Sequence, residues 1–354
     1  MTIKTKFKNI IITGGAGFIG GNLICKLINE DYANIFNIDK LGFSSDLTAI
    51  DLALNNNEMY FSHKYKLFNI DLIEKNKLNK VFELANPDLV IHLAAESHVD
   101  RSIDNPEKFV MSNVIGTLNI LEASLIHFKK LDPSRKKIFR FHHVSTDEVF
   151  GSLSELSSKF DENTKYDPRS PYSASKAASD HLVRAWNHTY NLPISISNCS
   201  NNYGPWQYPE KLIPVVLQKA INLEKIPLYG NGENIRDWLH VDDHINAILL
   251  IVNNGDIGAN YCIGGSNEIK NKDLIKMICE YLDWRLPKEF SYKDLITHVN
   301  DRPGHDYRYA INSSLIKDDL DWNSNISFKD GLSNTIDWYL KNLDWVDRVI
   351  KKYS

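Results

Sequence analysis

The sequence has few features that would tie it to a membrane, to nucleic acid or to an oxidising compartment. We find no apolar stretch that approaches the length of a membrane span, and neither sign of charge forms a long run. The chain therefore predicts neither a membrane nor a nucleic acid as a partner. Cysteine is scarce and forms no C-x-x-C pair; the four residues are Cys25, Cys199, Cys262 and Cys279. Such isolated thiols are typical of reduced, structural cysteines in the cytoplasm.

What the chain does contain is a large apolar fraction arranged in short runs. Its 354 residues are 43% hydrophobic and show no internal repeat, which suits one large or two medium-sized domains. The strand-like runs lie at 9–14, 34–39, 89–95, 137–145 and 193–198, and the clearest helical patterns lie at 107–129 and 171–190. Continuous β-branched runs separated by helices predict a parallel sheet that helices cover on both faces. This is the doubly wound, Rossmann-type α/β fold.

The second half of the chain differs from the first in composition and in the length of its predicted elements. After about residue 197, loops rich in Asn, Gly, Pro and Tyr separate shorter helices. We therefore predict a Rossmann domain over 1–196 and a smaller C-terminal lobe, suited to binding a substrate, over 197–354. Part of 236–265 could return to the main sheet.

A glycine-rich turn follows the first predicted strand. In "IIITGGAGFIGG" the spacing is Gly14-x-x-Gly17-x-x-Gly20. Gly14 would permit a tight turn, Gly17 would let the backbone approach a pyrophosphate, and Gly20 would let the next helix pack on the strand. Asp39 ends the next predicted strand, and an acid about 20 residues after the glycines binds the ribose 2′-hydroxyl of NAD and repels the 2′-phosphate of NADP. The pattern predicts an NAD site, although an ordinary structural turn could account for either feature alone.

The stretch "DPRSPYSASKAASDHL" predicts the start of a long helix that carries a base. Ser170 suits the N-cap and Pro171 the first helical position. Tyr172 and Lys176 then share one helix face at i, i+4 spacing. A nearby ammonium and the positive end of the helix both favour phenolate. We therefore expect a lowered pKa for Tyr172, which would let it act as a base near neutral pH.

The glycine turn and the Tyr172-x-x-x-Lys176 pair together resemble the extended short-chain dehydrogenase/reductase superfamily. Within it, five further stretches resemble the nucleoside-diphosphate-glucose 4,6-dehydratases, best known for acting on dTDP-glucose. They are "LAAESHVDRSI" (93–103), "STDEVFG" (145–151), "NNYGPWQYPEKLIP" (201–214), "YGNGENIRDWLHVDDH" (229–244) and "DRPGHDYRYAI" (301–311). Related epimerases share the glycines and the Tyr-Lys pair but usually lack the Asp-Glu pair. The chain departs from the family at Phe150, where tyrosine is common, and at "LGFSSD" (41–46).

The resemblance implies a lyase reaction in which the acid pair of "STDEVFG" supplies an acid and a base. Water leaves C6 of a hexose readily only after C4 is oxidised to a ketone, because the ketone makes the C5 proton acidic. The resemblance implies that Tyr172 takes the 4-hydroxyl proton while NAD takes the C4 hydride, with Thr146 and Lys176 holding oxygens in place. Glu148 then removes the C5 proton, Asp147 protonates the departing hydroxyl, and the hydride returns to C6. Both acids can face one sugar only if the strand ends near Thr146, because adjacent residues of a strand point to opposite faces.

The remaining candidate site residues follow from the resemblance and from the chemistry of a nucleotide sugar. A diphosphate needs converging cations, and Arg236 and Arg302 are expected to supply them with His305 and Lys211. The candidate substrate residues are Ser97, Thr146, Asn201, Lys211, Leu212, Pro227, Tyr229, Arg236, Asn267, Arg302 and His305. The candidate cofactor residues are Gly14, Gly17, Phe18, Ile19, Gly20, Asp39, Lys40, Asp71, Leu72, Leu93, Ala94, Ala95, Ser112, Tyr172, Lys176 and Asn202. No cluster of His, Cys and Asp residues has the spacing of metal ligands, so we expect no metal.

Two other functions stay open on this evidence. A nucleotide-sugar 4-epimerase or decarboxylase could use the same scaffold, but Asp147 would then be superfluous. A non-catalytic NAD-binding regulator would have no reason to keep all five catalytic candidates. Without the resemblance, a capping role for Asp147 and a solvated Glu148 would be the simpler interpretation. The leading prediction is a cytoplasmic NDP-glucose 4,6-dehydratase that acts on dTDP-glucose or UDP-glucose, as in rhamnose-type deoxysugar biosynthesis.

The two long helical patterns also bear on assembly. Those at 107–129 and 171–190 carry apolar residues beyond a single core-facing stripe. In the family that the chain resembles, the equivalent helices of two subunits pair as a four-helix bundle. The sequence therefore predicts a homodimer.

Overall fold

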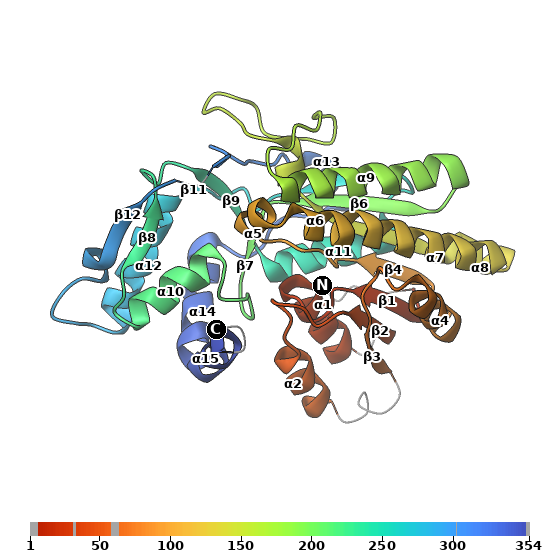
Figure 1. The fold of residues 1–354 in the computed structure, drawn as a ribbon, viewed down its shortest axis with the longest axis horizontal. Helices are drawn as coiled ribbons and strands as arrows, with labels where there is room; N and C mark the ends of the chain where they lie inside the picture. The colour runs from red at the N-terminus through yellow and green to blue at the C-terminus, as the bar shows by residue number, and fades with distance from the viewer. Residues whose placement is uncertain (1–5, 31–32, 58–63, 302, 352–354) are drawn as a thin grey trace.

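The central element of the fold is a parallel sheet. The computed structural model describes residues 6–351 except 31–32, 58–63 and 302. Across these residues a seven-stranded sheet runs in the order β10-β6-β5-β4-β1-β2-β3, and every neighbouring pair is parallel (Figure 1). Its strands are β1 (Asn9–Thr13), β2 (Asn34–Asp39), β3 (Tyr65–Asn69), β4 (Leu89–His92), β5 (Arg140–Thr146), β6 (Ile194–Cys199) and β10 (Asn260–Ile263).

Helices cover both faces of the sheet because its strands are apolar on both sides. On β1, Ile10 and Ile12 pack with α1, α2 and α11, whereas Ile11 between them packs on the opposite side with α4, α7 and α9. These helices are α1 (Phe18–Asn29), α2 (Thr48–Asn56), α4 (Lys75–Ala85), α7 (Gly116–Lys130), α9 (Pro171–Tyr190) and α11 (Val241–Asn254). The predicted doubly wound, Rossmann-type fold is confirmed.

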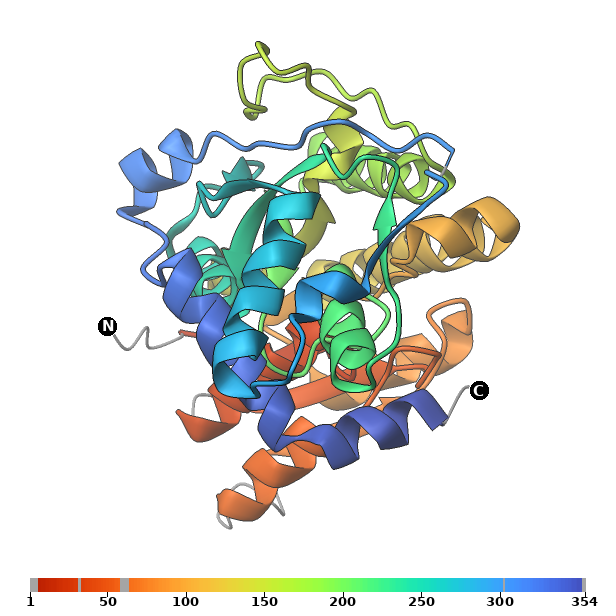
Figure 2. The same cartoon turned by 90° about the vertical axis from the view of Figure 1, so that its left-hand side faces the viewer.

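A smaller lobe lies beside the main sheet. Its described residues form a three-stranded sheet, β11-β9-β7, and a two-stranded sheet, β12-β8. Helices α10, α12, α14 and α15 gather around one apolar core, and Figure 2 shows them side by side on the face toward the viewer. The elements of this lobe are β7 (Asn201–Tyr203), β8 (Ile226–Tyr229), β9 (Ile235–His240), β11 (Glu268–Lys270), β12 (Ile296–Val299), α10 (Leu212–Ile221), α12 (Asn271–Arg285), α14 (Phe328–Lys341) and α15 (Leu343–Lys351).

The two lobes are interleaved along the chain. β6 runs through 194–199, so the expected division at 196/197 falls inside a strand of the main sheet. Within 236–265, α11 packs against α1 and β10 forms the sheet edge beside β6. Beyond the predicted boundary, the main sheet therefore still gains β10 and its covering helix α11.

The helix expected at 107–129 is longer and less regular than predicted. It consists of α6 (Pro106–Phe109), a π-helical turn (Val110–Ile115) and α7. Contrary to our expectation, this run, Pro106–Lys130, is long and apolar enough to cross a membrane by length and composition. Half of its apolar window is buried inside the protein, where α7 packs against α4 and α9. Core helices meet the same criterion, so the finding is weak evidence for a membrane.

The strand expected at 137–145 begins later than predicted. Residues Pro133–Ile138 form the short helix α8, which Asp132 caps through hydrogen bonds from the backbone N–H groups of Ser134 and Arg135, so β5 starts at Arg140. The remaining short elements are α5 (Val99–Asp104), α13 (Ser314–Leu320) and two 3-10 turns, Asp147–Phe150 and Tyr292–Leu295. All four cysteines lie in the described part of the chain and are free thiols.

Candidate active site

The glycine turn between β1 and α1 is closed so tightly that side chains are excluded from it. Gly14 has a φ of +73°, and a Cβ there would lie 2.7 Å from the backbone of Ala94. A Cβ at Gly20 would lie 2.3 Å from the carbonyl oxygen of Gly14. At Gly17, the N-cap of α1, a Cβ would meet only the Gly14 oxygen, at 3.2 Å. The turn thus leaves the start of α1 open toward the cleft, as a dinucleotide pyrophosphate requires.

Asp39 ends β2 and fixes the backbone around this turn. Its carboxylate accepts hydrogen bonds from the N–H of Ala16 at 2.9 Å, from the N–H of Leu41 at 2.8 Å and from the hydroxyl of Ser45 at 3.0 Å. Burial raises the pKa of Asp39, while these bonds favour its ionised form. The residue expected at the ribose therefore also holds the loop that follows β2.

The acid pair lies where β5 changes into a 3-10 turn. β5 ends at Thr146, whose hydroxyl accepts the N–H of Glu148 at 3.3 Å and caps the turn that begins at Asp147. The alternation of a strand no longer applies beyond Thr146. Asp147 and Glu148 both line the same cleft, as the proposed chemistry needs.

Asp147 is almost fully buried, at 2% exposure, and its Oδ2 accepts no hydrogen bond from any described residue. Its Oδ1 lies 3.4 Å from the Thr146 hydroxyl. Burial raises the pKa of Asp147 well above its ordinary value, and the charges of Glu148 and Asp237 raise it further. This environment favours the protonated carboxyl, which is the form that a general acid needs.

Helix α9 places the tyrosine and the lysine beside the acid pair. Ser170 is the N-cap in a reciprocal capping box with Ser173, and Pro171 opens the helix. Lys176, 4% exposed, donates a hydrogen bond to the Val144 carbonyl at 2.9 Å. Tyr172 lines the cleft beside it.

The expectation of a lowered pKa for Tyr172 was wrong when only the groups of the protein itself are considered. Burial raises the pKa of Tyr172 well above its ordinary value, and the charge of Glu148 adds to the increase. Burial also lowers the pKa of Lys176. The loss of hydration thus outweighs the ammonium and the helix end on which the expectation of a phenolate rested.

One cleft along the carboxyl ends of the strands contains every predicted catalytic and cofactor residue. Four predicted substrate residues also line it: Ser97, Thr146, Asn201 and Lys211. The other substrate candidates lie outside its lining: Leu212, Pro227, Tyr229, Arg236, Asn267 and His305. Arg302 lies outside the described residues.

Three of the cations expected at a diphosphate lie in the described part of the chain, and each has a partner within the protein. The guanidinium of Arg236 donates to the carbonyls of Ile235 at 2.7 Å and Asp306 at 3.0 Å. His305 pairs with Asp301 at 2.6 Å. Lys211, which does line the cleft, donates to the Ser97 carbonyl at 2.8 Å.

The loop that follows Asp39 differs from the family and was not among the predicted site residues, although residues 42–45 line the cleft. Its anchor is Asp46. The Asp46 N–H donates to the carbonyl of Ala16 in the glycine turn at 2.8 Å, and its carboxylate accepts the indole N–H of Trp345 from α15 at 2.9 Å. Trp345 is far away in the sequence, so no local signal pointed to this contact.

Behind Lys176, Asp180 and His143 were also missed as a pair. Asp180 continues the spacing of Tyr172 and Lys176 by a further four residues, a signal that the sequence does offer. Among the described residues no group of three or more His, Cys, Asp or Glu side chains could hold a metal ion. The absence of a metal stays an expectation.

A Rossmann sheet, a glycine turn and a Tyr-Lys pair beside two acids define a dinucleotide-dependent enzyme of the dehydrogenase/reductase type. A family model described as GDP-mannose 4,6 dehydratase matches residues 11–335, and the chain belongs to this nucleotide-sugar 4,6-dehydratase family.

Individual relatives show which members of this family the chain is similar to in sequence and structure. The dTDP-glucose 4,6-dehydratase of Shigella flexneri is 46% identical over 348 residues, which cover 96% of this chain and 95% of the relative. The structure of the dTDP-glucose 4,6-dehydratase DesIV from Streptomyces venezuelae, determined with NAD bound, has a TM-score of 0.84 at 35% identity and covers 96% of this chain and 99% of that one. The Bacillus anthracis dTDP-glucose 4,6-dehydratase, in complex with NAD, has a TM-score of 0.83 at 36% identity and covers 97% and 99%. The resemblance to nucleoside-diphosphate-glucose 4,6-dehydratases is confirmed.

Proposed function

We propose that the protein is an NAD-dependent dTDP-glucose 4,6-dehydratase, a lyase that forms dTDP-4-keto-6-deoxyglucose and water. The observation that carries the proposal is Asp147, a buried carboxyl with an unpartnered oxygen and a raised pKa, next to Glu148 in the cleft. An epimerase or a decarboxylase on this scaffold has no use for a second acid there. The names of the relatives support the same reaction.

The cleft suits NAD for two reasons. Side chains are excluded from the turn at Gly14 and Gly20, so a pyrophosphate can approach the start of α1. Asp39 lies at the end of β2, where its charge disfavours a 2′-phosphate. When bound, NAD would supply a hydride acceptor for C4, a hydride donor for C6 and a positive charge. The candidate cofactor residues would hold it along the cleft.

The protein's own groups would handle the protons. Tyr172 would accept the proton of the 4-hydroxyl, with Thr146 and Lys176 holding oxygens in place. Glu148 would remove the C5 proton once C4 is a ketone, and would return a proton to C5 when the hydride is delivered to C6. Asp147 would give its proton to the departing 6-hydroxyl, which leaves as water. Among the described residues the Asp147 Oδ2 has no hydrogen-bond donor that would stabilise the carboxylate, which suits this role.

A single assay tests the reaction. The purified protein is incubated with dTDP-glucose without added cofactor, and the 4-keto-6-deoxy product is followed. Formation of the 4-epimer instead, without loss of water, would favour the epimerase alternative. Binding of NAD without any product would favour the regulator.

We expect NAD to be bound to the protein as purified, because reduced cofactor must not leave between the two hydride transfers. The cofactor released on denaturation should be NAD and not NADP, since Asp39 would repel the 2′-phosphate. Chromatography of the released nucleotides measures this. Recovery of NADP, or equal turnover with either cofactor, would contradict the role of Asp39.

We expect both dTDP-glucose and UDP-glucose to be substrates. The stretch expected at the base, Pro227 to Tyr229 with Lys211 and Leu212, offers no group that plainly demands either the thymine methyl or the ribose 2′-hydroxyl. Room for one methyl group discriminates by only about 1–3 kcal/mol. The ratio of the two kcat/KM values measures the preference. A ratio above about a thousandfold, or roughly 4 kcal/mol, would reveal a dedicated polar contact.

We expect a homodimer in solution. Large apolar side chains stay exposed along the run that ends in α7, among them Val110 at 47%, Met111 at 40% and Ile126 at 45%. A partner that covered them would remove this apolar surface from water. Light scattering at micromolar concentration measures the mass, and a clean monomer would refute the dimer.

Free thiols at all four cysteines accord with the proposed cytoplasmic location.

A further inference from the structure

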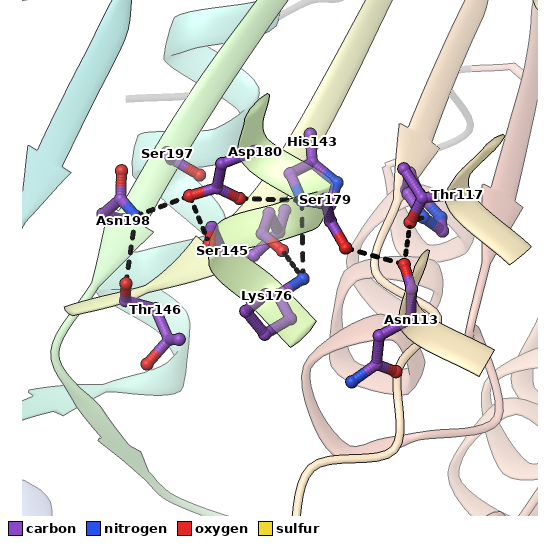
Figure 3. A network of polar contacts seen from close by, with 12 residues as sticks. Asn113, Thr117, His143, Ser145, Thr146, Lys176, Ser179, Asp180, Ser197 and Asn198 are labelled. Atoms are coloured by element: carbon purple, nitrogen blue, oxygen red, sulfur yellow. Dashed lines mark hydrogen bonds and ion pairs between the residues drawn. The ribbon is translucent and has the colours of Figure 1, made fainter. Parts of the chain in front are cut away.

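Helix α9 carries a column of polar side chains beyond the tyrosine and the lysine. Tyr172, Lys176, Asp180 and Arg184 follow one another at i, i+4 spacing, so they share one helix face. Lys176 is 4% exposed and Asp180 is fully buried, with β5 and β6 packed against the helix (Figure 3). A lysine and an aspartate buried this deeply require hydrogen-bond and charge partners.

Asp180 has hydrogen-bond partners on one oxygen and a histidine beside the other. Its Oδ2 accepts hydrogen bonds from the hydroxyls of Ser145 at 2.9 Å and Tyr166 at 2.8 Å, and from the Asn198 amide at 3.3 Å. Its Oδ1 lies 3.1 Å from Nε2 of His143. Burial alone would raise the pKa of Asp180, but these donors hold the pKa below its ordinary value. Asp180 is therefore an anion in the interior of the protein.

His143 lies between this anion and the lysine. The Lys176 Nζ is 3.5 Å from the same Nε2 and donates to the Val144 carbonyl at 2.9 Å (Figure 3). Burial, with the charge of Lys176, lowers the pKa of His143 to about 4, so the imidazole is neutral near pH 7. The Nε2 atom lies 3.1 Å from Asp180 and 3.5 Å from Lys176, so the neutral ring stands between the two charged groups without cancelling either charge.

Three further titratable groups near Lys176 are neutral near pH 7. They are His92 on β4, whose pKa burial lowers well below its ordinary value, Cys199 on β6, whose pKa burial raises to about 12, and Tyr172 on α9 itself. On the far side of Asp180, Arg184 donates to the Tyr166 hydroxyl at 2.8 Å. Among the described groups that act on Lys176, Asp180 is thus the one that carries negative charge.

We propose that Asp180, acting through the neutral imidazole of His143, is a positioning residue that keeps Lys176 ionised and directed into the cleft. Asn198 extends the same network to the active site, because its amide donates both to Asp180 and to the Thr146 carbonyl at 3.0 Å (Figure 3). One buried carboxylate therefore orders the lysine and the strand end that precedes Asp147. The catalytic meaning of this role rests on the proposed dehydratase function.

The direct test measures the ionisation of Lys176 and needs no turnover. Protein labelled with ¹³C at the lysine ε-carbon is titrated by NMR, and the Lys176 signal is identified by its loss in Lys176→Met. In Asp180→Asn the carboxylate charge is gone, and we expect the pKa of Lys176 to fall by about 1 unit or more, a tenfold change in its acidity. Tyr166→Phe is the matched control, since it removes one hydrogen bond to the same carboxylate and leaves the charge. Its Lys176 titration should follow the wild type.

The outcomes separate the positioning role from the proposed reaction. Equal Lys176 titrations in Asp180→Asn and wild type, or equal shifts in Asp180→Asn and Tyr166→Phe, would overturn the inference. If wild-type protein is inactive on dTDP-glucose but the titration shifts as expected, the dehydratase proposal fails and the positioning role stands. In active enzyme, the alkaline limb of the kcat/KM profile should move to lower pH in Asp180→Asn and stay in place in Tyr166→Phe.

A second variant covers the case in which Asp180→Asn does not fold. The double variant Lys176→Met/Asp180→Asn removes both charges, so the uncompensated ammonium of the single variant is gone. We expect the double variant to recover soluble protein that unfolds cooperatively. Failure of the second change to restore folding would count against the coupling of the two residues.

Discussion

Asp147→Asn should stop the enzyme halfway, with NADH accumulating on the protein while dTDP-glucose is oxidised at C4. An amide cannot protonate the departing hydroxyl, so the dehydration step should slow by about 10²–10⁴-fold. Oxidation at C4 depends on Tyr172 and Lys176, which the change does not touch. Rapid mixing with dTDP-glucose, followed by the near-ultraviolet absorbance of NADH, measures the two steps separately.

Glu148→Gln is the matched control for this variant. It should also accumulate NADH, but through loss of the base that removes the C5 proton. In deuterated water the oxidised sugar should therefore exchange its C5 hydrogen in Asp147→Asn and not in Glu148→Gln. Elimination at the wild-type rate in Asp147→Asn would exclude Asp147 as the acid.

Gly20→Ala should weaken cofactor binding although it adds a single methyl group. The new Cβ would lie 2.3 Å from the Gly14 carbonyl oxygen and 2.9 Å from the Gly15 Cα, both of them backbone atoms. The turn between β1 and α1 must then open, at a cost of about 1–3 kcal/mol in the free energy of unfolding. We expect NAD affinity to fall at least about tenfold, because each 1.4 kcal/mol of binding free energy is a factor of ten. Calorimetric titration and thermal unfolding measure the two effects.

The neighbouring position offers a close control. In Gly21→Ala the nearest atom to the added Cβ is the Gly15 carbonyl oxygen at 3.5 Å, an ordinary contact. Alanine is also favoured over glycine inside a helix by up to about 1 kcal/mol. Gly21→Ala should therefore bind NAD as the wild type does and unfold at the same or a higher temperature. Equal behaviour of the two variants would show that the turn tolerates a side chain.

Features that depend on neighbouring residues could be predicted from the sequence. Strands β1, β2, β4, β5 and β6, the closure at Gly14 and the capped start of α9 follow from short patterns, whereas β3 was not predicted. The break after Thr146 followed from requiring both acids to face one sugar. Charge and desolvation could not be predicted in the same way. The pKa of Tyr172 rises because the folded chain buries it, and the Arg236 guanidinium donates to backbone carbonyls that fold against it. Both effects depend on residues distant in the sequence.

The contact of Asp46 with Trp345 joins residues that are 299 positions apart. On a ribosome, the glycine turn and the loop beside it would emerge early, whereas the indole that holds this loop would emerge only when nearly all of the sheet and the smaller lobe had been made. Until then, Asp46 would keep its bond to the glycine turn but lack its partner on α15. The loop beside the cofactor site would therefore be fully held only late in synthesis. We expect a chain that ends before Trp345 to bind NAD more weakly than the full-length protein.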